Sequence, residues 1–307
     1  MAGMAEDAAD KLPDTGPAPA AEGGFSVDKA LEILKMPVTQ AILLLTGAVV
    51  FAFWPLFQLI WVQWTNPDTL YQHGPLIPFA IAYIVWANWD RLQHIPIKGS
   101  WFAIVPMLAI MYLTIIGSNS GVFGSVMTLL MLAMTGCVIW LVMGFRWVLV
   151  SIPLMIFATL GLPVWTSFVD NNTNGAQILS TEGAYHILNV AGFDPFRRAP
   201  TIIDLNNFTL NVAAACSGMK LTLAMASSVM FIIMIARLKW WGNLTLIALA
   251  IPLSIAINAL RIALIGVVGN QGGHDAGMWM HDYGSYGTLV LAFYLLYIAA
   301  KGLGWKV

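Results

Sequence analysis

Long apolar segments recur along most of the chain, and they constrain its fold more than any other feature of the sequence. A transmembrane α-helix needs about 20 apolar residues to cross the hydrocarbon core of a bilayer. Eight segments reach or approach that length, near residues 40–62, 74–89, 101–117, 121–144, 146–168, 216–236, 243–267 and 287–303. We therefore expect an all-α polytopic membrane protein with about eight transmembrane helices.

Charged residues are too scarce to cover the surface of a soluble protein. Asp, Glu, Lys and Arg make up 9% of the 307 residues, whereas a soluble domain carries roughly 25%. The net charge is −1 and no basic cluster is present, which argues against a nucleic-acid partner because phosphate binding needs a face rich in Lys and Arg. Two cysteines are too few for a disulfide framework.

The N-terminal segment differs from the rest in composition. Residues 1–24 are mostly Ala, Gly, Pro and acidic residues and lack the apolar core of a signal peptide. Residues 25–36 mix apolar and charged residues, as an interfacial helix or a solvated tail does. We predict a disordered cytoplasmic tail with an interfacial helix over residues 1–36 and a transmembrane domain over residues 37–307.

The distribution of Lys and Arg predicts the orientation in the membrane. With the N-terminus in the cytoplasm, ten of the 14 basic residues lie on the inner side, and the outer loops hold only Arg197 and Arg198. Short cytoplasmic loops collect basic residues, so both termini are expected to be cytoplasmic. The other two, Lys220 and Arg261, fall inside the outer halves of spans. A charge inside the membrane costs at least ~2.5 kcal/mol, so each is a functional candidate unless its side chain reaches the interface.

Two outer loops are expected, and the longer covers about residues 169–215. It contains an amphipathic stretch (176–190) and two short β-like runs on either side of Asn206 and Asn207. Asn-centred turns between such runs are typical of β-hairpins. The predicted hairpin leads directly to Cys216 at the start of a span. There, the unpaired N–H groups of the helix favour a thiolate, although a cysteine among small residues is also common in helix packing, the role we expect for Cys137.

The second outer loop, about residues 268–286, contains His274 and His281, each followed by Asp. Two His–Asp pairs could bind a metal, but no third ligand is spaced with them, and we expect neither a metal nor another cofactor. Thiol, guanidinium, imidazole and ammonium groups are thus predicted to gather on the outer side of the membrane, in a small extracytoplasmic hairpin and loop region.

Three segments that carry these groups resemble the signatures of the exosortase and archaeosortase family. They are AACSGMK with Cys216, NALRI with Asn258 and Arg261, and MHDYGSYG with His281. The resemblance extends over about residues 40–303. The family histidine is usually followed by Gly at the fourth position, where this chain has Ser285, and His274 is the alternative histidine.

The resemblance implies a membrane-embedded cysteine protease-transpeptidase in the cytoplasmic (inner) membrane, surrounded by lipid, with its active site at the extracytoplasmic face. Cys216 would form an acyl-enzyme, His281 would transfer protons, and Arg261 would stabilise the oxyanion or hold a substrate carboxylate. Lys220, Asn258 and Ser217 are the substrate-binding candidates. The implied partners are exported proteins with a C-terminal motif such as Pro-Glu-Pro, then a transmembrane helix and a basic cluster.

Two other functions are compatible with some of these residues. A polytopic anion transporter could use Arg261 and Lys220, but it needs a polar path inward, and residues 247–258 contain only two polar side chains. A rhomboid-like serine protease could use Ser217, but Ala215 stands where its Gly-x-Ser-Gly motif needs glycine.

Overall fold

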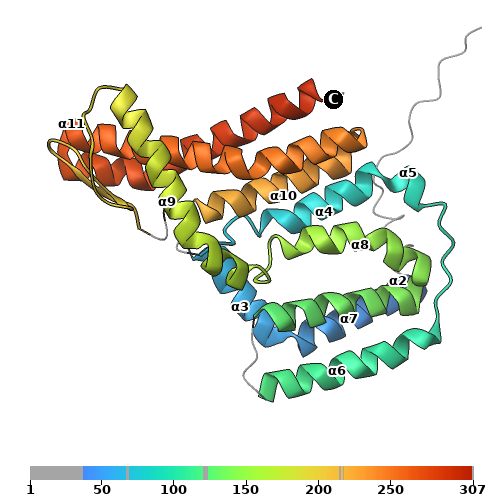
Figure 1. Ribbon diagram of the computed structural model, residues 1–307. Coiled ribbons are helices and arrows are strands. Elements are labelled where there is room, and N and C mark those ends of the chain that lie inside the picture. The colour runs from blue at the N-terminus through green and yellow to red at the C-terminus, as the bar shows by residue number, and fades with distance from the viewer. Residues whose placement is uncertain (1–36, 67–68, 120–123, 214–215, 217, 306–307) are drawn as a thin grey trace, which may run out of the picture. The chain divides into compact units, whose positions relative to one another are not determined.

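The computed structural model describes residues 37–66, 69–119, 124–213, 216 and 218–305. This part of the chain is mostly helical, with a small sheet between two of the helices (Figure 1). The first elements are α2 (Pro37–Ala52), α3 (Trp54–Thr65), α4 (Leu76–Ala87), α5 (Trp89–Leu92), η1 (Trp101–Ala103), α6 (Ile104–Asn119), α7 (Ser125–Met143) and α8 (Phe145–Thr159). They are followed by α9 (Thr166–Val190), β1 (Phe196–Ala199), β2 (Ile202–Asp204), β3 (Thr209–Asn211), α10 (Met219–Ala236) and α11 (Trp240–Gly302).

Residues 45–307 form one compact unit and residues 1–44 another. Of the unit formed by residues 1–44, the structure describes only residues 37–44, which lie in α2. The predicted tail and interfacial helix of residues 1–36 therefore lie outside the described residues.

Several helices have the length and composition of membrane spans. Within the described residues, four helical segments qualify, namely Trp101–Ser118, α7, α10 and α11, and a fifth is added if α2 and α3, bent by 77°, count as one span. Two more apolar helices, α4 and α8, have 12 and 15 residues. Each of the eight apolar segments predicted from the sequence contains a helix, so the prediction of a mostly helical chain with several helices of membrane-spanning length and composition is confirmed, whereas the number of eight spans stays a prediction.

The two segments predicted as outer loops are mostly helical in the structure, and the amphipathic stretch predicted over residues 176–190 lies within one of these helices. Helix α9 occupies Thr166–Val190, and α11 continues through residues 268–286 with a single non-helical residue, Gly273 (φ 81°, ψ −174°). Helix α9 is polar overall, but its buried residues include Ser180, Thr181, Ala184 and Leu188, at the three-to-four spacing of a single helix face. That face packs on α11, and this contact outweighs the loop-like composition.

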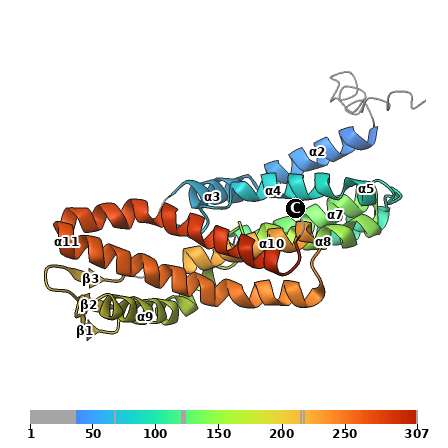
Figure 2. The same ribbon diagram turned by 90° about the horizontal axis from the view of Figure 1, so that it is seen from above.

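Gly273 divides α11 into two arms that lie side by side (Figure 2). The arms pack through small and aliphatic side chains, and α10 joins the same cluster, whose fully buried members are Met225, Leu246, Ala292, Leu296 and Ala300. Two glycines near the turn make room for the ring of Phe208, because a Cβ at Gly269 or Gly277 would come within 2.8 Å of that ring.

The predicted hairpin is confirmed as β2 and β3, which pair antiparallel with Ile203 opposite Leu210. Strand β1 adds to β2 and completes a sheet of order β1-β2-β3. Ile203 and Leu210 are buried in a cluster with residues from α9 and from the first arm of α11, and Cys216 belongs to the same cluster. The sheet thus anchors the chain immediately before the cysteine.

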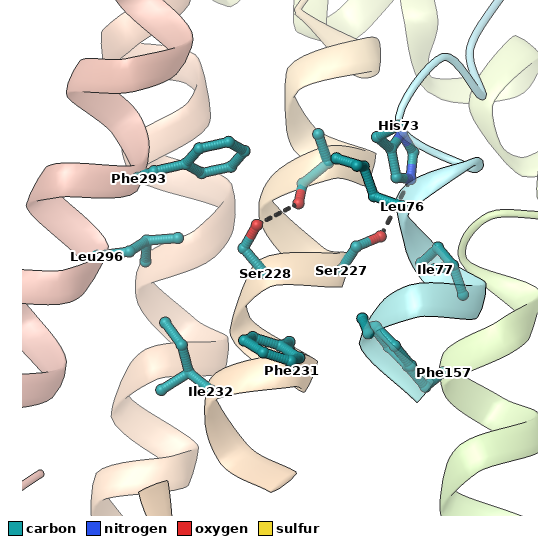
Figure 3. Close-up of a pocket in the computed structure, with 12 residues that line it drawn as sticks. His73, Leu76, Ile77, Phe157, Ser227, Ser228, Phe231, Ile232, Phe293 and Leu296 are labelled. Atoms are coloured by element: carbon teal, nitrogen blue, oxygen red, sulfur yellow. Dashed lines mark hydrogen bonds between the residues drawn. The ribbon is translucent and has the colours of Figure 1, made fainter. Parts of the chain in front are cut away.

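Hydrogen bonds of His73 connect the turn before α4 to the C-terminal end of α8 and to α10. His73 Nε2 lies 3.0 Å from the carbonyl oxygen of Leu160 and 3.1 Å from Ser227 Oγ. Burial lowers the pKa of His73, and because a carbonyl only accepts hydrogen bonds, Nε2 holds the proton of the neutral ring. His73, Ser227 and Ser228 form the polar edge of a mainly apolar pocket (Figure 3).

Candidate active site

Cys216 lies between β3 and α10, where the chain changes from strand to helix. Its backbone N–H donates to the carbonyl of Ala213 at 2.8 Å. Its side chain is largely buried, at 9% exposure. Two residues later, Gly218 adopts a left-handed conformation (φ 86°, ψ −1°) and caps the start of α10. The cysteine is thus held on a tight turn at a helix N-terminus, where oriented N–H groups stabilise negative charge.

Asn258, in the first arm of α11, supports this turn. Its Nδ2 donates to the carbonyl oxygen of Cys216 at 2.9 Å, and the side chain is buried at 1% exposure. Asn258 also packs against Gly218, where an added Cβ would lie 2.9 Å from its Cγ and Nδ2. Gly218 therefore meets two requirements, a left-handed backbone and a close approach to the amide.

We expect Gly218→Ala to destabilise the protein by about 2 kcal/mol or more, since left-handed strain alone costs about 1–2 kcal/mol and the contact with Asn258 adds to it. Thermal unfolding of the purified protein in detergent measures the loss. Gly192→Ala is the matched control, because Gly192 has φ 81° but open space around its Cα. Equal losses for the two variants would show that the Asn258 contact contributes nothing.

His281, in the second arm of α11, faces the cysteine. Its Nε2 lies 3.2 Å from Cys216 Sγ, within hydrogen-bond distance for sulfur. On the other side of the ring, Nδ1 lies 3.0 Å from Oδ1 of Asp282. The thiol therefore contacts one side of the imidazole and the carboxylate contacts the other, an arrangement that allows a proton to move from sulfur to the ring.

Arg261 lies three residues after Asn258 on the same arm. Its NH2 group donates to the carbonyl oxygen of His281 at 3.4 Å and so connects the two arms of α11. Its Nε is buried and lacks a hydrogen-bond partner within the described residues. Arg261 is also absent from the ion pairs found there. A guanidinium keeps its charge at all relevant pH values, so this cation, with no carboxylate paired to it within the described residues, suits an anionic or developing negative group.

The remaining predicted residues differ in their positions. His274 directly follows the turn at Gly273, and its ring lies 6.4 Å from that of Phe208, centroid to centroid. His281 lies seven positions further along the helix, roughly 10 Å along the axis. Lys220 is half-buried in the first turn of α10. Ser217 lies outside the described residues. Of the two candidate histidines, His281 is the one that the fold places at Cys216.

Sequence reasoning overlooked Asp282 as a contributor to this site. The His281-Asp282 dipeptide was noted only as half of a possible metal site. Neighbouring residues on a helix point in different directions, so adjacency alone did not predict that the carboxylate would contact the ring.

Comparison with known protein families places these residues in a recognised domain. A family model described as transmembrane exosortase matches residues 61–298, a range that includes Cys216, Asn258, Arg261 and His281. No curated protein and no solved structure shows a significant match to the chain.

Proposed function

Because the chain belongs to the transmembrane exosortase family, we propose that it is a cysteine protease-transpeptidase that cleaves the C-terminal sorting tails of exported proteins. Family membership supports a membrane transpeptidase-like role in general. The more specific proposal rests mainly on the 3.2 Å contact between Cys216 and His281. A thiol held in this way can be converted to a nucleophile without a cofactor.

In the acylation step, Nε2 of His281 takes the thiol proton as the sulfur of Cys216 attacks the scissile carbonyl carbon. The new C–S bond gives a tetrahedral oxyanion. When this intermediate collapses, the C–N bond breaks and the departing amine takes the proton from the imidazolium, leaving a thioester on Cys216. Water or an acceptor amine then attacks the thioester carbon and gives a proton to Nε2 of His281. When this second tetrahedral intermediate collapses, the C–S bond breaks and the sulfur of Cys216 takes the proton back from the imidazolium, so that the carboxylic acid or the new amide is released and the thiol is restored.

Arg261 is the group best suited to the negative charge of this reaction. Its guanidinium contacts the backbone carbonyl of His281 and has one N–H without a partner in the described part of the chain, and a cation in a partly buried site interacts strongly with an anion. We assign it the oxyanion or the carboxylate of the substrate motif. Lys220, four residues after Cys216, is the second candidate for that carboxylate.

Asn258 takes a different role from the one expected. Its Nδ2 is occupied by the carbonyl of Cys216, so we assign it to positioning the nucleophile segment rather than to substrate binding. The proposed site faces the extracytoplasmic side of the cytoplasmic membrane, with both termini in the cytoplasm, as the distribution of Lys and Arg predicts.

Co-expression tests the proposal. The chain is produced in a bacterial host with reporters that end in tails from its own genome, each with a short motif, an apolar helix and a basic cluster. We expect a shortened reporter on immunoblots, and its loss when the motif alone is replaced by alanines. If the membrane-inserted protein shortens none of these reporters, sorting-tail cleavage is the wrong function.

A further inference from the structure

We propose that Asp282 is a positioning residue that holds the imidazole of His281 in the orientation and tautomer that serve Cys216. This role rests on the proposed function, in which His281 exchanges protons with the thiol. Nothing in the signature motifs assigned a task to this carboxylate.

The hydrogen-bond chemistry of the ring carries the inference. An ionised carboxylate only accepts hydrogen bonds, so the 3.0 Å contact between Asp282 Oδ1 and His281 Nδ1 places a proton on Nδ1. In the neutral ring, Nε2 then has a free lone pair, and this atom lies 3.2 Å from Cys216 Sγ. Without the carboxylate, the ring could carry its proton on Nε2 and would then be unable to accept one from sulfur.

The chain contains an internal comparison. His274 and Asp275 form the same dipeptide on the same arm of α11 and are both exposed. Within the described residues, no hydrogen bond or ion pair joins these two side chains, and the ring of His274 lies near Phe208. A His–Asp dipeptide on this helix therefore does not by itself produce the contact, and the pair that makes it is the pair beside the cysteine.

The charges around His281 set the size of the expected effect. Arg261 contacts its backbone carbonyl, and Lys220 lies in the first turn of α10. Helix α9 also packs on α11 and carries Glu182, whose carboxylate is engaged with His186 and Arg197. The side chains of His281 and Asp282 are 38% and 63% exposed, so solvent weakens their attraction and we expect a contribution of about two- to five-fold.

Thiol alkylation tests the role without a substrate. In a Cys137→Ala background, iodoacetamide modification of Cys216 is followed by mass spectrometry from pH 5 to 9 in detergent-solubilised protein. We expect Asp282→Asn to slow alkylation about two- to five-fold near neutral pH, because the thiolate–imidazolium pair loses its supporting carboxylate. The rates should converge at alkaline pH, where a thiol ionises without a neighbouring cation. Asp282→Glu should recover part of the rate.

Asp275→Asn is the matched control, since it removes the same charge from the same arm. The proposal is overturned if the Asp282→Asn profile coincides with that of Asp275→Asn. Its failure is distinct from failure of the proposed function. A pH profile that depends on Asp282, in a protein that cleaves no sorting tail, would support the positioning role and refute the substrate assignment.

Discussion

We expect Cys216→Ala to reduce tail processing by at least about 10³-fold, the scale of loss when a nucleophile is removed from a covalent mechanism. The other cysteine of the chain, Cys137, lies buried in α7, in a different helix from the site residues. The ratio of processed to intact reporter in co-expression measures the effect. Alanine is smaller than cysteine, so the turn at Gly218 can still form. The hydrogen bond from Asn258 Nδ2 to the backbone carbonyl of residue 216 can also still form.

Cys137→Ala is the control for this variant, because it removes the same group from a buried helix face and should leave the ratio unchanged. If Cys216→Ala still releases the shortened reporter, the acyl-enzyme mechanism is wrong. In that case, a serine-reactive probe would test Ser217 as the nucleophile.

We expect Arg261→Gln to lower the processing rate by about 10²–10³-fold, the cost of removing one main oxyanion donor, if Arg261 has the proposed role. Glutamine retains hydrogen-bonding capacity but has no positive charge. Arg261→Lys should recover only part of the rate, because an ammonium keeps the charge but lacks the planar set of donors. Time courses of reporter processing measure the rates, and alkylation of Cys216 verifies that the thiol remains accessible and reactive.

Arg198→Gln is the matched control. Arg198 lies in β1, and its side chain is 63% exposed and paired with Asp204; we expect no change in rate. Full processing by Arg261→Gln would remove Arg261 from the mechanism. Anion flux through liposomes that required Arg261 but tolerated Cys216→Ala would instead favour the transporter.

The sequence predicted the elements and residues whose signals are local. Apolar length placed a helix in every expected segment, and the Asn-centred turn placed the β2–β3 hairpin before Cys216. Motif resemblance selected Cys216, Arg261 and His281 from a chain with two cysteines and five histidines, and the fold brings the three together.

The errors arose where packing between distant segments decides the structure. Helix α9 is polar in composition and becomes helical against α11, a partner that no local window of sequence contains. The segment over residues 268–286 is helical as well, and its Gly269 and Gly277 make room for Phe208, which lies 61 and 69 residues earlier in the chain. The contact of Asp282 with His281 depends on side-chain rotamers, which spacing along a helix does not specify.

The turn at Gly273 divides the proposed site into residues that are translated earlier and residues that are translated later. The residues before it supply the thiol, the amide that holds its backbone and the guanidinium, whereas the imidazole and its carboxylate are on the arm that follows. A nascent chain that has reached Gly273 thus contains a cysteine with no base beside it. Proton transfer to His281 becomes possible only after the returning arm has been translated and has packed against the first, so the nucleophile is the earlier part of the site and its activation the later.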